Sequence, residues 1–275
     1  MPDDAVTIPE APAFTPFVPD WDVSDPDICQ STYFGAEHGP RPTPEWVITD
    51  DAAHQIERGI LKTGKEADVH LVERRLGPRH NLLAAKRYRS AAHRQFRDDS
   101  RYRRARPTGN RRTDLAIAQG SRAGVAFRAD QWVGNEFAVL GRLWAAGVSV
   151  PYPVQRDGSE LMIEYLGDDD GAAPRLVHAP LVVGQAADLF AQAVANVRLC
   201  AAQGIVHGDL SPYNMLVWDG RLYLIDFPQA VDPIVHPDGL RLLERDIANL
   251  CQWGRRHGVA CDPGELCAEV MAVIF

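Results

Sequence analysis

The fold of this 275-residue chain is indicated most clearly by two segments, Ile205-Val-His-Gly-Asp-Leu-Ser-Pro-Tyr-Asn214 and Leu222-Tyr-Leu-Ile-Asp-Phe227. Asp209 and Asn214 match the H-x-D-x-x-x-x-N spacing, in which the aspartate meets an acceptor hydroxyl and the asparagine holds magnesium. Asp226 follows an apolar run, so a strand would deliver a second carboxylate to the metal. Mg2+ accepts such a sparse oxygen set when phosphates complete its coordination. The pattern predicts phosphoryl transfer from a nucleotide; the alternative is an ordinary turn and a helix cap.

The segment Gly59-Ile-Leu-Lys-Thr-Gly-Lys-Glu66 comes close to the phosphate loop G-x-x-x-x-G-K-[ST] of P-loop NTPases. Glu66 stands where that loop needs a hydroxyl for magnesium. Residues 67–72 alternate between apolar and polar, which favours a strand over the helix that a P-loop opens. We therefore reject the P-loop. We predict instead a glycine loop between two strands that lies over the nucleotide, as in protein kinases.

A short apolar strand, residues 82–88, carries Lys86 near its end, where kinases place a lysine that touches the nucleotide phosphates. A helix over residues 132–144 follows from apolar residues at helical spacing, and Glu136 lies on it as the candidate ion-pair partner. The alternative for Glu136 is a solvated helix position. The chain has only three lysines beside 26 arginines, and all three lie in this half. This bias supports a specific role for Lys86.

The segment Glu160-Leu-Met-Ile-Glu-Tyr-Leu-Gly167 is typical of a strand that runs into a hinge between two lobes. Its backbone amide and carbonyl groups would hydrogen-bond an adenine edge. A buried strand that ends in a glycine turn is the alternative. The segment falls between the Glu136 helix and the Asp209 loop, which favours the hinge.

Three motifs together resemble the RIO family of atypical protein kinases: Lys62-Thr-Gly-Lys-Glu-Ala67, the segment from His207 to Asn214, and Ile225-Asp-Phe-Pro-Gln-Ala230. The resemblance runs from about residue 57 to residue 249. Ordinary protein kinases carry Arg before the catalytic Asp and Gly two residues after the metal Asp, where this chain has Gly208 and Pro228. Small-molecule kinases of the aminoglycoside and choline type share His-Gly-Asp, but they do not usually carry the other two motifs.

The resemblance implies an α+β fold, a two-lobed protein-kinase-like fold with a truncated C-lobe, of the RIO branch without a winged-helix domain. It implies ATP and Mg2+ as cofactors and serine/threonine protein kinase or ATPase activity, with a phosphoryl-aspartate at Asp226 as one product. Lys62 departs from the family, which often has Ser at that place. The implied site residues are Asp209 and Asp226 for catalysis, Asn214 and Asp226 for the metal, and Thr63, Lys65, Glu66, Lys86, Glu136, Glu164 and Leu166 for the nucleotide.

The chain divides into three predicted parts. Residues 1–44 are rich in Pro and Asp and predict an extended arm that packs on the kinase body. Residues 45–163 would form the N-lobe and residues 164–275 the C-lobe, in which few residues remain after Asp226 for an activation segment. Helices are predicted over residues 185–203 and 240–253, and Asp246 on the second is a candidate brace for the catalytic-loop backbone. The alternative for Asp246 is a solvated position.

The composition, with 45% hydrophobic and 24% charged residues, is typical of a globular chain. No apolar run approaches the ~20 residues of a membrane span, and the N-terminus lacks a signal-peptide layout. The five cysteines form no C-x-x-C pair, which argues against zinc and suits a reducing compartment. We therefore expect a cytoplasmic protein that does not contact membranes.

Residues 87–112 hold ten arginines and only two acidic residues, although the whole chain carries a net charge of −8. This Arg-rich segment predicts a contact with RNA or a ribosomal particle, against the alternative of a solvated loop. The protein acceptor is unknown from sequence. Two further functions stay open: a nucleotide-gated ribonucleoprotein assembly factor, which acts as a switch, and a small-molecule phosphotransferase.

Overall fold

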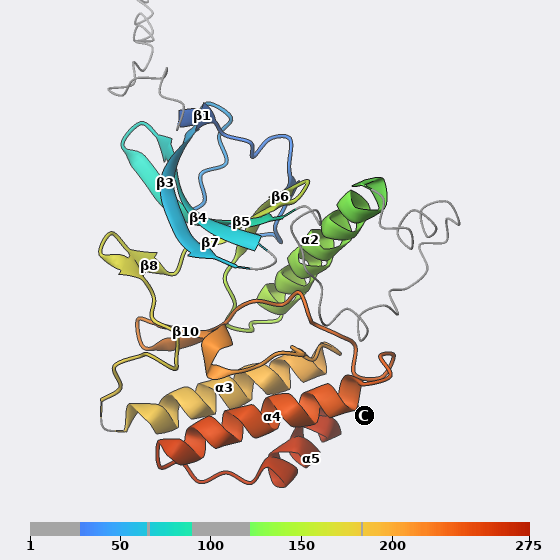
Figure 1. Cartoon of the computed structure of the whole chain (residues 1–275). Helices are drawn as coiled ribbons and strands as arrows, with labels where there is room; N and C mark the ends of the chain where they lie inside the picture. The colour runs from blue at the N-terminus through green and yellow to red at the C-terminus, as the bar shows by residue number, and fades with distance from the viewer. Residues whose placement is uncertain (1–27, 65–66, 90–121, 183) are drawn as a thin grey trace, which may run out of the picture.

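The computed structural model describes residues 28–64, 67–89, 122–182 and 184–275. These residues form two lobes, a strand-rich N-lobe and a helical C-lobe (Figure 1). The chain passes from one lobe to the other immediately after residue 164. The predicted two-lobed, kinase-like α+β fold is confirmed.

An antiparallel sheet of seven strands forms the N-lobe, in the order β1-β3-β4-β5-β7-β6-β2. Side chains of β5 alternate between its two faces. Leu83 and Ala85 join a small buried cluster on one face, while Lys86 and Tyr88 point to the other. The strands are β1 (Ile28–Gln30), β2 (Glu37–His38), β3 (His54–Thr63), β4 (Ala67–Leu76), β5 (Arg79–Tyr88), β6 (Pro153–Asp157) and β7 (Glu160–Glu164).

The segment before residue 45, which the sequence assigns to an arm, contributes β1 and β2 from residue 28 onward. These two strands form opposite edges of the sheet, because β1 pairs with β3 and β2 pairs with β6. The described part of the arm is therefore hydrogen-bonded into the N-lobe.

Helix α2 (Arg122–Ala145) lies beside the sheet and close to the C-lobe (Figure 1). Val133, Phe137 and Leu140 recur at helical spacing and are buried in the main core. This apolar stripe fixes the rotation of the helix. It therefore also fixes the direction of Glu136, one residue before Phe137.

The C-lobe rests on three helices, α3 (Gln185–Ala202), α4 (Gly239–Arg256) and α5 (Pro263–Ile274). The predicted helices over residues 185–203 and 240–253 are thus confirmed as α3 and α4. Gly254 of α4 touches Phe190 of α3, and a Cβ at this glycine would lie 2.8 Å from the ring. Short elements complete the lobe: β8 (Gly167–Asp168), β9 (Gly171–Ala172), the 3-10 turn η2 (Pro212–Asn214), β10 (Met215–Trp218) and β11 (Arg221–Leu224).

A disulfide joins Cys251 of α4 to Cys261 in the loop before α5, and their Cα atoms lie 5.6 Å apart. The cysteine spacing did not predict this bond. The loop turns back against the end of α4, where Val259 N–H donates to Gly254 O at 2.9 Å. This reversal brings the two cysteines together. None of the described helices is long and apolar enough to cross a membrane.

Candidate active site

Lys86 pairs with two carboxylates, Glu136 of its own lobe and Asp226 of the C-lobe. Its Nζ lies 2.8 and 3.0 Å from the oxygens of Glu136 and 2.7 Å from Oδ1 of Asp226. Burial alone lowers the pKa of Lys86, but the charges of Glu136 and Asp226 raise it well above its ordinary value. Lys86 is therefore a fixed positive charge at the boundary between the lobes.

Glu136 makes three kinds of contact and is nearly fully buried, with 3% of its side chain exposed. Besides Lys86, its carboxylate accepts hydrogen bonds from the Tyr88 hydroxyl and from the Phe227 N–H, the latter at 3.1 Å. Strand β5, helix α2 and the segment after β11 are thus joined at one carboxylate. The solvated alternative for Glu136 does not hold.

Asp226 has a backbone φ of 71°, the left-handed region that non-glycine residues seldom adopt. Such a conformation costs about 1–3 kcal/mol and is often found at functional sites. The side chain is 38% exposed. Burial raises the pKa of Asp226, but the charge and hydrogen bond of Lys86, together with the charges of Lys62 and His207, lower it below its ordinary value. Asp226 is therefore an ionised carboxylate at the end of β11.

The catalytic-loop segment brings Asp209 and Asn214 together through the 3-10 turn η2. Nδ2 of Asn214 donates to the backbone oxygen of Asp209 at 2.8 Å and to its carboxylate at 3.2 Å. The Asn214 carbonyl accepts from Ile225 N–H at 3.0 Å, which ties this loop to the residue before Asp226. Asp209 and Asp226 thus belong to neighbouring, hydrogen-bonded segments.

Helix α4 braces the same loop from behind. The carboxylate of Asp246 accepts from the N–H groups of Gly208 and Leu210, at 2.8 and 3.0 Å. Gly208 has a φ of 79°, and a Cβ there would lie 2.3 Å from the Gln229 oxygen. This clash explains physically why glycine precedes Asp209. The predicted brace by Asp246 is confirmed.

His207 is buried, and the sequence analysis gave it no role beyond its place in the catalytic-loop motif. Its Nδ1 accepts from Asp209 N–H at 3.3 Å, so Nε2 carries the proton and donates to Ile225 O at 3.0 Å. Burial lowers the pKa of His207, which favours this neutral form. The imidazole therefore acts as a polar cross-link between the two segments that carry Asp209 and Asp226.

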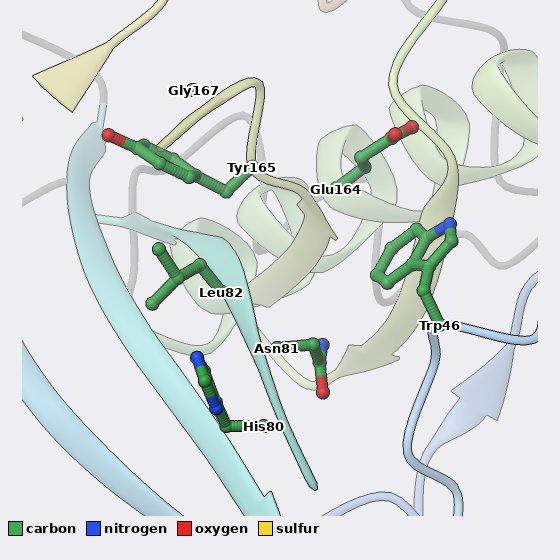
Figure 2. Close-up of a pocket in the computed structure, with 7 residues that line it drawn as sticks. All are labelled: Trp46, His80, Asn81, Leu82, Glu164, Tyr165 and Gly167. Carbon is green, nitrogen blue, oxygen red and sulfur yellow. The ribbon is translucent and has the colours of Figure 1, made fainter. Parts of the chain in front are cut away.

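Glu164, which we predicted as a hinge residue, directs its side chain toward the backbone of Tyr152. Its carboxylate accepts from Tyr152 N–H at 3.0 Å, and burial raises its pKa. Figure 2 shows Glu164 on the Trp46 side of a pocket, with Tyr165 on the opposite side. The pocket has a volume of about 320 Å³. The Glu164 N–H also donates to the Tyr152 carbonyl, at 2.8 Å. Leu166 is buried, and its carbonyl accepts from Ala173 N–H at 2.9 Å.

The predicted phosphate-loop residues are only partly described. Thr63 ends β3 and pairs with Asp68 of β4, as expected for a loop between two strands. Lys65 and Glu66 lie outside the described residues, as does most of the Arg-rich segment. Sequence reasoning left Lys62 and Arg175 out of the site, although each lies close to it. The substitution of Lys for the usual Ser at residue 62 was the available signal.

The donor atoms fit magnesium. Lys86 holds Oδ1 of Asp226, which leaves Oδ2 for a cation. Asn214 uses its amide nitrogen on Asp209, which leaves the amide oxygen as a ligand atom. Magnesium prefers oxygen ligands and is usually held by few protein groups together with phosphates.

A two-lobed fold with a Lys–Glu pair, an Asp–Asn loop and an aspartate at a strand end defines a protein-kinase-like chain. The RIO domain model matches residues 71–266, and the chain belongs to the RIO domain family. The resemblance found in the motifs is thereby confirmed.

Several curated relatives are named as RIO kinases. The RIO-type serine/threonine-protein kinase Rio1 of Haloferax volcanii is 36% identical over 208 residues, which cover 76% of this chain and 66% of the relative. Rio1 of Thermoplasma acidophilum is 36% identical over 135 residues, 49% of this chain and 69% of the relative. The human serine/threonine-protein kinase RIO1 is 30% identical over 203 residues, 74% of this chain and 34% of the relative. The matched part therefore spans about two thirds of the archaeal relatives and one third of the human one.

Proposed function

We propose that this protein binds ATP and Mg2+ and transfers the γ-phosphoryl group to a protein Ser or Thr, or to its own Asp226. The observation that carries the proposal is the Lys86 network, which joins Glu136 and Asp226 beside the Asp209–Asn214 loop. Family membership supports the same reaction, because the named relatives are serine/threonine-protein kinases.

The proposed roles follow from the charges and hydrogen bonds. Lys86 contacts the nucleotide phosphates. Asn214 and Asp226 hold magnesium, which would neutralise charge on the transferred phosphoryl group. The carboxylate of Asp209 orients the acceptor hydroxyl and takes its proton. The new P–O bond forms to the acceptor oxygen as the bond to the β-phosphate oxygen breaks. Positioning and electrostatics supply most of the acceleration.

Asp226 itself is the second proposed acceptor. It is an ionised carboxylate that is 38% exposed, so a phosphoryl group could reach it. The product is an acyl phosphate, and its slow hydrolysis would let the protein work as a nucleotide-gated switch for a ribonucleoprotein partner. We keep this switch, and a small-molecule phosphotransferase, as the alternatives to a protein-substrate kinase.

The variant Asp226→Asn tests the proposal. An amide supplies neither the negative charge for magnesium nor the phosphoryl acceptor, so magnesium-dependent ATP turnover should fall to background. Asp188→Asn, at an exposed position of helix α3, is the matched control and should keep wild-type turnover. ATP labelled in its γ-phosphoryl group separates the acceptors. A hydroxylamine-labile label that is absent from Asp226→Asn supports the aspartyl route, whereas a resistant label indicates Ser or Thr. Wild-type turnover in Asp226→Asn would disprove the metal assignment.

A further inference from the structure

Lys62 lies on the same face of the N-lobe sheet as Lys86. Lys62 of β3 is directly opposite Val69 of β4, and Val69 is directly opposite Lys86 of β5. Residues that oppose each other in antiparallel strands point to the same face. The three side chains therefore form one row, and the two lysines stand two strand spacings apart, about 10 Å. This face is the one from which Lys86 reaches Asp226.

Arg175 approaches the site from the C-lobe. It forms a β-bridge with Leu216, and its Nη1 donates to the Tyr213 carbonyl at 2.7 Å. Tyr213 immediately precedes the predicted metal ligand Asn214. One side of the guanidinium is thus anchored to the catalytic-loop segment, and the rest of the planar fork is left to take a second partner.

The charge of Arg175, on the C-lobe, acts on Lys62, on the N-lobe. Burial lowers the pKa of Lys62, and the positive charge of Arg175 lowers it further. Asp226 acts in the opposite direction, but its Oδ1 already pairs with Lys86. Within the described part of the chain, neither Lys62 nor Arg175 forms a salt bridge. An external anion that binds both cations would offset the repulsion between them.

We propose that Lys62 and Arg175 form a two-cation clamp, one cation from each lobe, that binds the terminal phosphates of a nucleoside triphosphate. The planar fork of Arg175 suits two phosphate oxygens at once, and Lys62 adds a point charge on a flexible stem. The clamp would draw the lobes together on a triphosphate and would distinguish it from a monophosphate. This inference rests on the proposed nucleotide-dependent function, because Lys86 would hold the inner phosphates of the same ligand.

Calorimetric titration of the full chain with ATP, ADP and AMP, with magnesium present, tests the clamp. Lys62→Ser and Arg175→Gln should each weaken ATP binding about tenfold or more, because each removes a charge-assisted contact. AMP affinity should change less than about twofold, since the monophosphate reaches only the Lys86 end. Arg198→Gln removes an exposed charge that pairs with Glu269 on the α3–α5 side, and it should leave all three affinities unchanged.

The variants should also behave differently without nucleotide. Lys62→Ser removes the repulsion with Arg175, so its melting temperature without ligand should equal or exceed that of the wild type. This readout excludes misfolding as the cause of weaker binding. Equal losses for ATP and AMP would overturn the clamp, and so would unchanged ATP affinity in both variants. If the wild type bound no nucleotide, both the clamp and the proposed function would be wrong.

Discussion

At the residue scale, the buried carboxylate of Glu136 needs a counter-charge and hydrogen-bond donors to offset its loss of water. It is balanced by Lys86 and by two hydrogen bonds, from the Tyr88 hydroxyl and Phe227 N–H. A buried ion pair adds little to stability compared with apolar residues, but the loss of one partner leaves an unbalanced charge. The pair is therefore a constraint that two distant segments must satisfy together.

Lys86→Met should lower the free energy of unfolding by about 3–5 kcal/mol, because it leaves Glu136 charged and without its cation. The double variant Lys86→Met/Glu136→Gln should recover part of this loss, since a neutral amide needs no counter-charge. Urea unfolding of the wild type and the variants gives the coupling energy. A double variant that is less stable than Lys86→Met would contradict this account. Activity should be lost in both.

At the element scale, helix α4 couples the C-lobe core to the catalytic loop. Leu243 and Ile247 bury one side of the helix in the core, while Asp246 and Asn249 face the loop. The Asn249 amide donates to Leu210 O at 3.0 Å, and the N–H of Leu210 donates to Asp246. A rigid helix therefore sets the backbone of residues 208–210.

Asp246 makes this brace dependent on pH. Burial raises its pKa to about 6, against an ordinary value of 3.8. The folded state thus binds the proton more tightly, and the stabilising contribution, complete below pH ~4, is lost as pH rises through ~6. The stability of the wild type relative to Asp246→Asn should fall by about 3 kcal/mol over this window. Urea unfolding between pH 4 and 7 measures the change. Asp238→Asn, at an exposed position before α4, leaves Asp246 in place and should keep the pH dependence of the wild type.

At the scale of the whole molecule, the lobes share one apolar core, which includes Phe137 of the N-lobe and Phe227 of the C-lobe, and they are also joined by charge at the site. The bond from Lys86 to Asp226 spans 140 residues of sequence and joins the sheet to the C-lobe hairpin. The Arg-rich segment begins at the end of β5, and all of it from residue 90 onward lies outside the described residues. We propose it as a polyanion contact on the grounds of its charge alone.

Replacing Arg94, Arg97, Arg101, Arg103, Arg104 and Arg106 by Ser tests this contact. For the wild type, the logarithm of RNA affinity should fall with the logarithm of salt by about 0.7 per phosphate neutralised on a single strand. The variant with all six substitutions should show a flatter slope of RNA affinity against salt and nearly unchanged ATP turnover. Fluorescence titration at several salt concentrations measures the slope. An unchanged slope would leave the segment as a solvated insertion, and a collapse of turnover would place it in the catalytic cleft.

The sequence alone determined the family and the fold class, and it predicted helices that the structure confirms as α3 and α4. Motif spacing is local: the five-residue step from Asp209 to Asn214 allows one tight turn to bring them together. Apolar periodicity predicted helix α2 and thereby the position of Glu136. These inferences succeeded because they depend on contacts within a single turn, strand or helix.

Only the tertiary structure decided which distant groups meet. The row from Lys62 to Lys86 depends on the register of three strands, which includes bulges in β3. The approach of Arg175 to the cleft and the direction of the Glu164 side chain depend on packing between segments far apart in sequence. The disulfide between Cys251 and Cys261 depends on a chain reversal after α4. Sequence spacing carries no information on such contacts, because register and packing are settled only when the lobes are assembled.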